Sequence, residues 1–240
     1  MSNPGSRATL PDPPGAHPAR LSRLLLIRHG QSTWNDERRI QGQLDPPLSD
    51  LGREQARRLA ERLAGGQYEA LYTSDLARAR ATAEAVGAAV GLEPIPTPEL
   101  REVALGEWEG LTREQLVAGY PEAWARWQSE PSWDLPPGGE GADLFEARVA
   151  RAVEEIFARH PQQEVLVVAH GGVIQVALGR LLGRASHGLF PFVIDNCSIS
   201  TLVRGGRRTL ITGVNDVCHL AAGEPITTAR DRTGGLTNTE

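Results

Sequence analysis

Cysteine and long apolar runs are scarce in this chain of 240 residues. Its two cysteines, Cys197 and Cys218, belong to no Cys-x-x-Cys pair, so the sequence favours neither a zinc site nor a disulfide framework. We expect both thiols to be reduced and at least half-buried. No apolar run reaches the ~20 residues of a membrane helix, and the proline-rich start lacks the apolar centre of a signal peptide. These absences predict a cytoplasmic protein with no membrane partner.

An excess of positive charge is also missing. The formal net charge is -5, with 25 basic against 30 acidic residues, whereas binding of nucleic acid needs a basic face. We therefore expect no nucleic-acid partner. With 40% hydrophobic residues, the chain is long enough to bury one large core. This predicts a single α/β domain over residues 23–220, between flexible tails at 1–22 and 221–240.

Two short aliphatic runs, at 24–27 and 165–168, each lead into a His-Gly pair. The first pair begins at His29, directly after Arg28, and the second begins at His170. Such runs are typical of strands buried on both faces of a mostly parallel sheet, where ligands bind just beyond the carboxyl ends of the strands. Both histidines are therefore expected to face one crevice.

The rest of the chain alternates between helical and strand patterns, as in an α/β fold. Arg78 falls in the first turn of one predicted helix, next to exposed amides that are suited to bind phosphate. Two glycines predict a hairpin between the last two strands. The predicted helices are 51–63, 76–90, 143–158 and 173–182, with short helices between 112 and 128, and the predicted strands are 24–27, 70–73, 165–168, 198–203 and 209–212.

Six segments carry a series of motifs in a fixed order. Residues 28–35 begin Arg-His-Gly-Gln-Ser, and residues 74–83 read Ser-Asp-Leu-Ala-Arg-Ala-Arg-Ala-Thr-Ala. In this order the segments resemble the histidine phosphatase superfamily, and the resemblance covers most of residues 23–220. It implies the phosphoglycerate mutase-like fold, a three-layer α/β/α sandwich with a mostly parallel central sheet. The six segments are 28–35, 39–52, 72–83, 100–110, 137–140 and 169–172.

The resemblance places the phosphorylated histidine at His29. A phosphate ester dianion repels anionic nucleophiles, so a neutral imidazole among cationic donors suits attack on phosphorus. Arg28 and Arg78 can each bind two phosphate oxygens, and a protonated His170 would supply a third donor. Glu102 is the candidate that protonates the departing alcohol and later activates water.

Several residues keep alternative interpretations. Glu102 also fits a surface carboxylate paired with Arg101, and Glu140 has no clear role because Gly141 stands where many relatives have serine. Arg80 is expected to be solvated or ion-paired. The other histidines (His17, His160, His187 and His219) are expected to be structural, and the tryptophans at 108, 124, 127 and 133 either pack in the core or line a pocket.

These motifs predict two overlapping groups of site residues. The catalytic group is His29, Glu102, His170, Arg28 and Arg78. The substrate-binding group is Arg28, Asn35, Gln41, Gly42, Arg78, His170 and Gly171.

The predicted function is hydrolysis of small phosphorylated metabolites by a phosphomonoesterase that needs no metal and no cofactor. A cofactor-dependent phosphoglycerate mutase is the alternative, although the Arg-Arg-Ser-Tyr run and the His-Gly-Asn triplet of such mutases are missing. A metal-dependent hydrolase built on the two histidines and a carboxylate is a second alternative, which Arg28 and Arg78 disfavour electrostatically. A non-catalytic adaptor is a third, but no key residue is missing. Assembly as a homodimer is left open.

Overall fold

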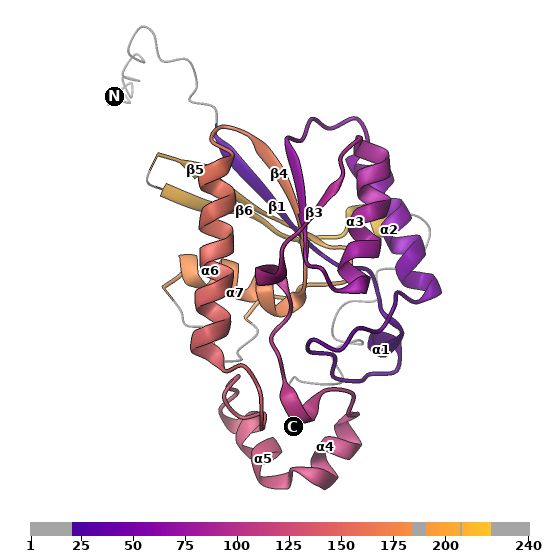
Figure 1. The fold of residues 1–240 in the computed structure, drawn as a ribbon, viewed down its shortest axis with the longest axis vertical. Coiled ribbons are helices and arrows are strands. Elements are labelled where there is room, and N and C mark those ends of the chain that lie inside the picture. Colours follow the sequence, from indigo (N-terminus) through magenta and orange to yellow (C-terminus); the bar gives the residue numbers. More distant parts are fainter. Residues whose placement is uncertain (1–20, 184–190, 207, 222–240) are drawn as a thin grey trace, which may run out of the picture.

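The computed structural model describes residues 21–183, 191–206 and 208–221 (Figure 1). Residues 1–20 and 222–240 of the two predicted tails lie outside these ranges, and the first strand already begins at Ser22. Six strands form one sheet in the order β3-β2-β4-β1-β5-β6. The first four strands run parallel: β1 (Ser22–Arg28), β2 (Ala70–Thr73), β3 (Pro94–Pro96) and β4 (Glu164–Ala169). A hairpin of β5 (Ile199–Gly205) and β6 (Arg208–Asp216) extends the sheet, with β5 antiparallel to β1.

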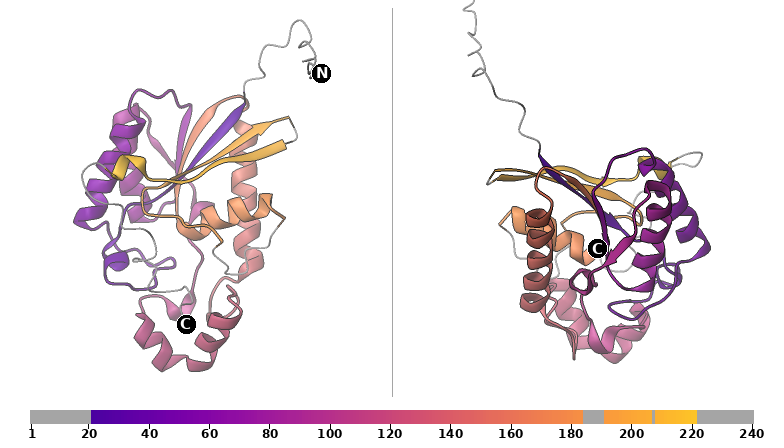
Figure 2. Two further views of the ribbon diagram at one scale, coloured as in Figure 1. Left: turned by 180° about the vertical axis from the view of Figure 1, so that it is seen from behind. Right: turned by 45° about the horizontal axis from the view of Figure 1, so that its top comes forward.

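Helices cover both faces of the sheet, which confirms the predicted three-layer sandwich (Figures 1 and 2). In β1, Leu24 and Leu26 belong to one apolar cluster, and Leu25 and Ile27 belong to the other. The strand is therefore buried on both sides because successive side chains point to opposite faces. The first cluster includes residues of α6 (Ala142–Arg159) and α7 (Gly171–Leu181), and the second includes residues of α2 (Asp50–Leu63) and α3 (Ala77–Val90).

The register of the two central strands brings the His-Gly pairs together. Arg28, the last residue of β1, is opposite Ala169, the last residue of β4. His29 and His170 therefore leave the sheet side by side. Beyond this edge lie α1 (Thr33–Asp36), α4 (Arg113–Gly119) and α5 (Pro121–Ser129), which extend the molecule away from the sheet in Figure 1.

Among the described strands and α-helices, two short elements were not predicted. The strand β3 has only three residues and contains two prolines, which hide the usual strand pattern. The helix α1 is a single turn, held by a capping box in which Ser32 accepts from the Asn35 amide. Both lie below the length at which hydrophobic periodicity is informative.

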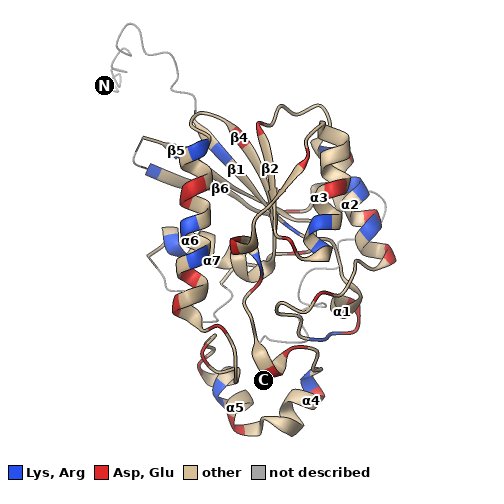
Figure 3. Cartoon of the chain, in the orientation of Figure 1, with Lys and Arg blue, Asp and Glu red and all other residues tan. Residues whose placement is uncertain are grey.

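Charges of both signs alternate along the outer faces of α2 and α6 (Figure 3). Arg57 in α2, for example, pairs with Glu54 and Glu61. Among the described residues, no helix is both long and apolar enough to cross a membrane. Cys197 is buried as expected, whereas Cys218 is exposed, contrary to the prediction, because it begins a short turn at the surface after β6.

Candidate active site

His29 and His170 form the centre of the candidate site. Their ring centroids lie 5.1 Å apart with an interplanar angle of 62°, and both side chains are buried. The predicted crevice thus exists at the carboxyl ends of β1 and β4. Because the two rings come from adjacent strands, the sheet fixes their separation.

The tautomer of His29 follows from its backbone contact. His29 Nδ1 lies 2.6 Å from the carbonyl oxygen of Gly30, and a carbonyl oxygen can only accept, so Nδ1 carries the proton. The lone pair of a neutral ring is then on Nε2. Gly30 itself is required by space, since a Cβ there would lie 2.5 Å from the Gly52 carbonyl oxygen. Burial, followed by the charges of Arg78 and Arg28, lowers the pKa of His29 well below its ordinary value.

Two buried arginines flank this ring. Arg78 donates to the carbonyl oxygens of Leu44 and Gly42, each at 2.8 Å, and Arg28 donates to the carbonyl oxygen of Ile194 at 2.6 Å. The Nε atom of each arginine is buried without a partner among the described residues. Burial lowers the pKa of Arg78 to about 10, which leaves the group cationic at neutral pH. The chain has no lysine, so guanidinium groups supply all its side-chain cations other than histidine.

The His170 ring is buried beside the two arginines of the site. Its Nε2 lies 2.8 Å from the Ser74 hydroxyl, while its buried Nδ1 has no partner among the described residues. Burial, then the charges of Arg78, His29 and Arg28, lowers the pKa of His170 well below its ordinary value. The ring is therefore neutral in the site without a ligand, and the expected protonation would need a bound anion.

Glu102 faces the same pocket from the loop after β3. Its Oε2 accepts from the Gly172 amide at 3.0 Å, and its Oε1 accepts from the Val103 amide at 3.1 Å. The alternative ion pair with Arg101 is wrong, because Arg101 Nε donates instead to Asp75 at 2.7 Å. A Cβ at residue 172 would lie 2.3 Å from Glu102 Oε1, so a larger residue there would displace the carboxyl group.

Two side-chain amides present donors to the pocket. Gln41 Oε1 accepts from the Ser32 hydroxyl at 2.8 Å, and Asn35 Oδ1 accepts from the Ser32 amide at 3.1 Å. Both side chains line the cavity, and because their oxygens are engaged, their NH2 groups are the atoms left as donors to a ligand. Of the two predicted glycines, Gly42 contributes its carbonyl to Arg78 and Gly171 packs next to Arg28, its ideal Cβ position 3.7 Å from Arg28 Nε.

Glu140, whose role the sequence left open, stabilises the backbone of the site through Arg148. It forms an ion pair with Arg148, with Nε and Oε1 2.5 Å apart. Arg148 also donates to the backbone carbonyls of Arg101 and Glu102, at 2.6 and 2.8 Å. The pair thus fixes the backbone that carries the Glu102 carboxyl group. Gly141 has a φ of +80°, a conformation that serine rarely adopts.

One supporting segment was missed by the sequence analysis. Asn196 Nδ2 donates to the His29 carbonyl oxygen at 3.0 Å, and the Cys197 amide donates to the Arg28 carbonyl oxygen at 3.0 Å. Thr82 accepts from the Gly30 amide at 3.0 Å. Only the position of residues 196–197 before a predicted strand could have drawn attention to them.

The remaining predicted roles can be placed as follows. The amide of Ala77, at the start of α3, donates to Asp45 at 2.7 Å, so this one amide of the helix end is already engaged. Arg80 is exposed beside Glu84, as expected. His160 contacts the Tyr72 hydroxyl at 2.9 Å, and His17 and His187 lie outside the described residues.

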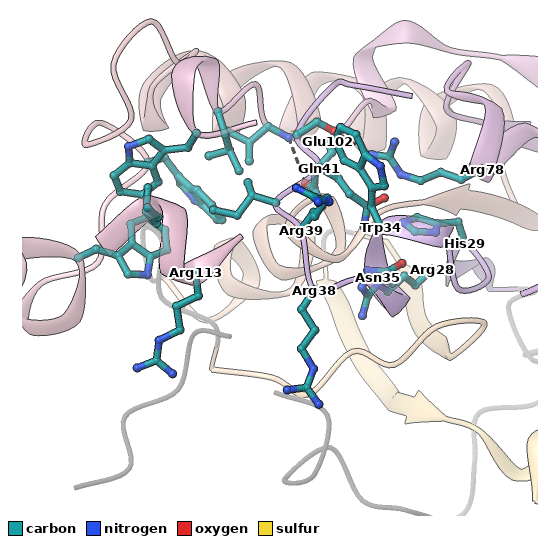
Figure 4. Close-up of a pocket in the computed structure, with 18 of the residues that line it drawn as sticks. Arg28, His29, Trp34, Asn35, Arg38, Arg39, Gln41, Arg78, Glu102 and Arg113 are labelled. Atoms are coloured by element: carbon teal, nitrogen blue, oxygen red, sulfur yellow. Dashed lines mark hydrogen bonds between the residues drawn. The ribbon is translucent and has the colours of Figure 1, made fainter. Parts of the chain in front are cut away.

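A cavity of about 270 Å³ begins at these residues and continues toward α4 and α5 (Figure 4). A single water needs roughly 10–15 Å³ by such a measure, so the cavity has room for an organic group beside a phosphate. The tryptophans named in the sequence analysis serve both expected purposes: they are buried in the core and they line this cavity. Within the described part of the chain, no group of three or more His, Cys, Asp and Glu side chains could hold a metal ion.

The fold and the site together define an α/β protein in which two buried guanidinium groups flank a histidine at the carboxyl ends of adjacent parallel strands. Comparison with known proteins agrees. Residues 24–217 match the model of the histidine phosphatase superfamily (branch 1), and the chain belongs to this superfamily.

Known proteins are similar to this chain over most of its length. It is 36% identical to phosphoserine phosphatase 1 of Hydrogenobacter thermophilus, over 83% of this chain and 95% of that protein. It is 33% identical to a metal-independent phosphoserine phosphatase of Arabidopsis thaliana, over 85% of each chain. The structure of YhfR from Bacillus stearothermophilus superposes with a TM-score of 0.78 at 33% identity, over 83% of this chain and 99% of that one.

Proposed function

We propose that this chain is a metal-independent phosphatase that hydrolyses small phosphate monoesters through a phosphohistidine on His29. Membership of the superfamily and the similarity to phosphoserine phosphatases support the phosphatase activity. The assignment of individual residues to steps rests on the geometry of the site.

One observation carries this assignment. Arg28 Nε, Arg78 Nε and His170 Nδ1 are all buried without a partner in the described structure, and the three residues surround His29. A buried polar atom without a hydrogen bond costs free energy of about 1–3 kcal/mol, more for a charged group. A phosphoryl group bound beside His29 is the ligand that we expect to supply acceptors to these atoms. The unpartnered nitrogens therefore support binding of an oxyanion.

In the first step, His29 Nε2 attacks phosphorus and forms a P–N bond. The bond between phosphorus and the alcohol oxygen breaks, and a proton from the Glu102 carboxyl group passes to that oxygen, so the product leaves as a neutral alcohol. The hydrogen bond from Nδ1 to the Gly30 carbonyl stabilises the positive charge that develops on the ring. Arg28 and Arg78 hold the equatorial oxygens throughout.

In the second step, the Glu102 carboxylate accepts a proton from a water molecule. The water oxygen attacks phosphorus, the P–N bond breaks, and inorganic phosphate is released while His29 regains its lone pair. His170 begins neutral and gains a proton when the dianion binds, because the anion counteracts the two arginine charges. The proton that His170 gains comes from solvent and returns to it when phosphate leaves.

Trapping of the intermediate tests this function. The chain is mixed with a ³²P-labelled aryl phosphate, quenched in alkali and denatured. A label that survives alkali and is lost in acid is expected, and His29→Ala should abolish both the label and turnover. His160→Asn is the matched control, since His160 lies at the far end of α6. Turnover or labelling that persists in His29→Ala would overturn the assignment.

The same preparation separates the phosphatase from the mutase. A phosphatase releases inorganic phosphate from 3-phosphoglycerate, whereas a mutase converts it into the 2-isomer with phosphate retained. Location in the cytoplasm and assembly as a homodimer remain proposals, to be tested by fractionation and by sedimentation.

A further inference from the structure

Ser74 directly follows the last residue of β2 and lies at the same edge of the sheet as the two histidines. Thr73, at the end of β2, is opposite Val168 of β4, and the Ser74 amide donates to the Val168 carbonyl oxygen at 3.0 Å. The neighbouring strands β2, β4 and β1 thus bring Ser74, His170 and His29 together. Ser74 and His170 are both 0% exposed, so no solvent competes for the contact between their side chains.

The surroundings of the Ser74 hydroxyl determine which atom donates in this contact. Its oxygen accepts from the Leu76 amide at 3.3 Å and lies 2.8 Å from His170 Nε2. If Nε2 carried the hydrogen of a neutral ring, the hydroxyl hydrogen would be buried without an acceptor among the described residues, which is costly. The hydroxyl therefore donates to Nε2, and the hydrogen of the neutral His170 ring lies on Nδ1.

The two buried rings thus share one tautomer but present opposite functions to a ligand. In His29, the hydrogen on Nδ1 is engaged by the Gly30 carbonyl, and the lone pair on Nε2 is left for phosphorus. In His170, the lone pair on Nε2 is engaged by Ser74. Its Nδ1, which has no partner in the described part of the chain, is left as a donor to a phosphoryl oxygen. The other tautomer of His170 would present a lone pair to that oxygen and repel it.

We infer that Ser74 is a positioning residue that makes His170 a hydrogen-bond donor to the phosphoryl group while the imidazole is still neutral. This inference rests on the proposed function and adds a residue to its site. A hydroxyl suits the position because it can rotate. It donates to the neutral ring, and when the bound anion brings a proton to Nε2, it accepts from that nitrogen instead. The hydrogen on Nδ1 is therefore kept for the ligand in both states.

Nitrogen NMR tests the tautomer directly. The full chain, labelled with ¹⁵N-histidine, is measured without ligand in mildly alkaline buffer. Long-range ¹H–¹⁵N correlations distinguish a hydrogen on Nδ1 from one on Nε2, and the spectrum of His170→Asn identifies the His170 signals. We expect the hydrogen on Nδ1, although free histidine favours Nε2. A hydrogen on Nε2 of His170 in the unsubstituted chain would overturn the inference.

Ser74→Ala gives a second readout. The smaller side chain is expected to fold, to move the His170 hydrogen at least partly to Nε2, and to weaken binding of orthovanadate about tenfold, because the donor to the anion is lost. Ser200→Ala is the matched control. It removes a buried hydroxyl of β5 that accepts from the Asn215 amide at 3.2 Å, and it should leave both the tautomer and the affinity unchanged.

Three results would contradict the role of Ser74. They are an unchanged tautomer in Ser74→Ala, an unchanged vanadate affinity in that variant, and a loss of affinity of the same size in Ser200→Ala, which would indicate a structural effect.

These outcomes are separate from those that test the proposed function. Neither the tautomer nor vanadate binding depends on turnover. A chain that releases phosphate but has the His170 hydrogen on Nε2 would uphold the phosphatase and overturn the role of Ser74. A chain with the expected tautomer that releases no phosphate would overturn the phosphatase and leave Ser74 as a residue that positions an anion-binding histidine.

Discussion

The Gly172 amide donates to Glu102 Oε2 at 3.0 Å, which couples the start of α7 to the loop after β3. The second His-Gly pair supplies the imidazole of His170, and the next residue, Gly172, also holds the Glu102 carboxyl group. Removal of the carboxyl charge leaves this contact possible, since an amide oxygen can still accept. Glu102→Gln thus removes the transferable proton and keeps the Gly172 contact, at the cost of the contact from the Val103 amide, from which an NH2 group cannot accept.

For Glu102→Gln we expect turnover of alkyl phosphates to fall about a hundredfold or more, because the leaving alkoxide needs a proton. The loss should be much smaller for 4-nitrophenyl phosphate, whose leaving group departs without one. Binding of orthovanadate should change little. Equal losses with both kinds of ester would move the acid to another carboxyl group.

The ion pair of Arg148 with Glu140 is expected to affect catalysis indirectly, by positioning Glu102. Arg148→Gln removes the donors to the carbonyls of residues 101 and 102, so kcat for alkyl phosphates should fall about tenfold while KM stays nearly constant. Measurement of kcat for alkyl and nitrophenyl esters tests this, because misplacement of Glu102 affects mainly the former. Arg148→Lys should restore part of the rate.

A matched control is an arginine of β5 whose partners lie on the same helix, α6. Arg204 pairs with Glu154 through two hydrogen bonds of 2.7 Å and stacks on Phe157, much as Arg148 stacks on Phe145. Arg204→Gln and Arg148→Gln should each lower the free energy of unfolding by about 1–3 kcal/mol. In Arg204→Gln, however, kcat should be unchanged. A fall in kcat in both variants would indicate general loosening of the fold.

Stability should depend on pH through the two central histidines. Burial lowers the pKa of His29 and His170 well below about 6.5. The unfolded chain binds protons that the native rings do not, so the free energy of unfolding falls as the pH drops below about 6.5 and is recovered above it. Thermal unfolding between pH 5 and 8 should show a shallower acid loss for His170→Asn. Identical slopes would show that this ring does not contribute.

Activity is expected to survive prolonged dialysis against a strong chelator. Arg28, Arg78 and His170, which is protonated once the anion is bound, supply the positive charge that a metal would otherwise supply. Phosphate release from 4-nitrophenyl phosphate, measured before and after dialysis, checks this. Loss of activity that zinc or manganese restores would favour the metal-dependent alternative.

Much of the fold was predictable because the central strands are uninterrupted aliphatic runs that end at His-Gly pairs. The same runs located His29 and His170, since parallel strands end at a common edge. The neutral state of His170 was not predictable, because it depends on how deeply the fold buries the ring beside Arg78. The supporting contacts of Asn196 and Arg148 were missed for another reason: each joins segments far apart in the sequence, and no local pattern marks such a contact.

The order of the strands also affects when the protein becomes competent during synthesis. β1 is made first, but its neighbours β4 and β5 come from residues 164–169 and 199–205, and the turn that holds the His29 backbone includes Asn196. A nascent chain that has already emerged with Arg28, His29 and Arg78 therefore still lacks both lateral partners of β1. Its phosphate-binding groups remain unassembled until nearly the whole domain has left the ribosome, so premature termination yields inactive fragments rather than weakened enzymes.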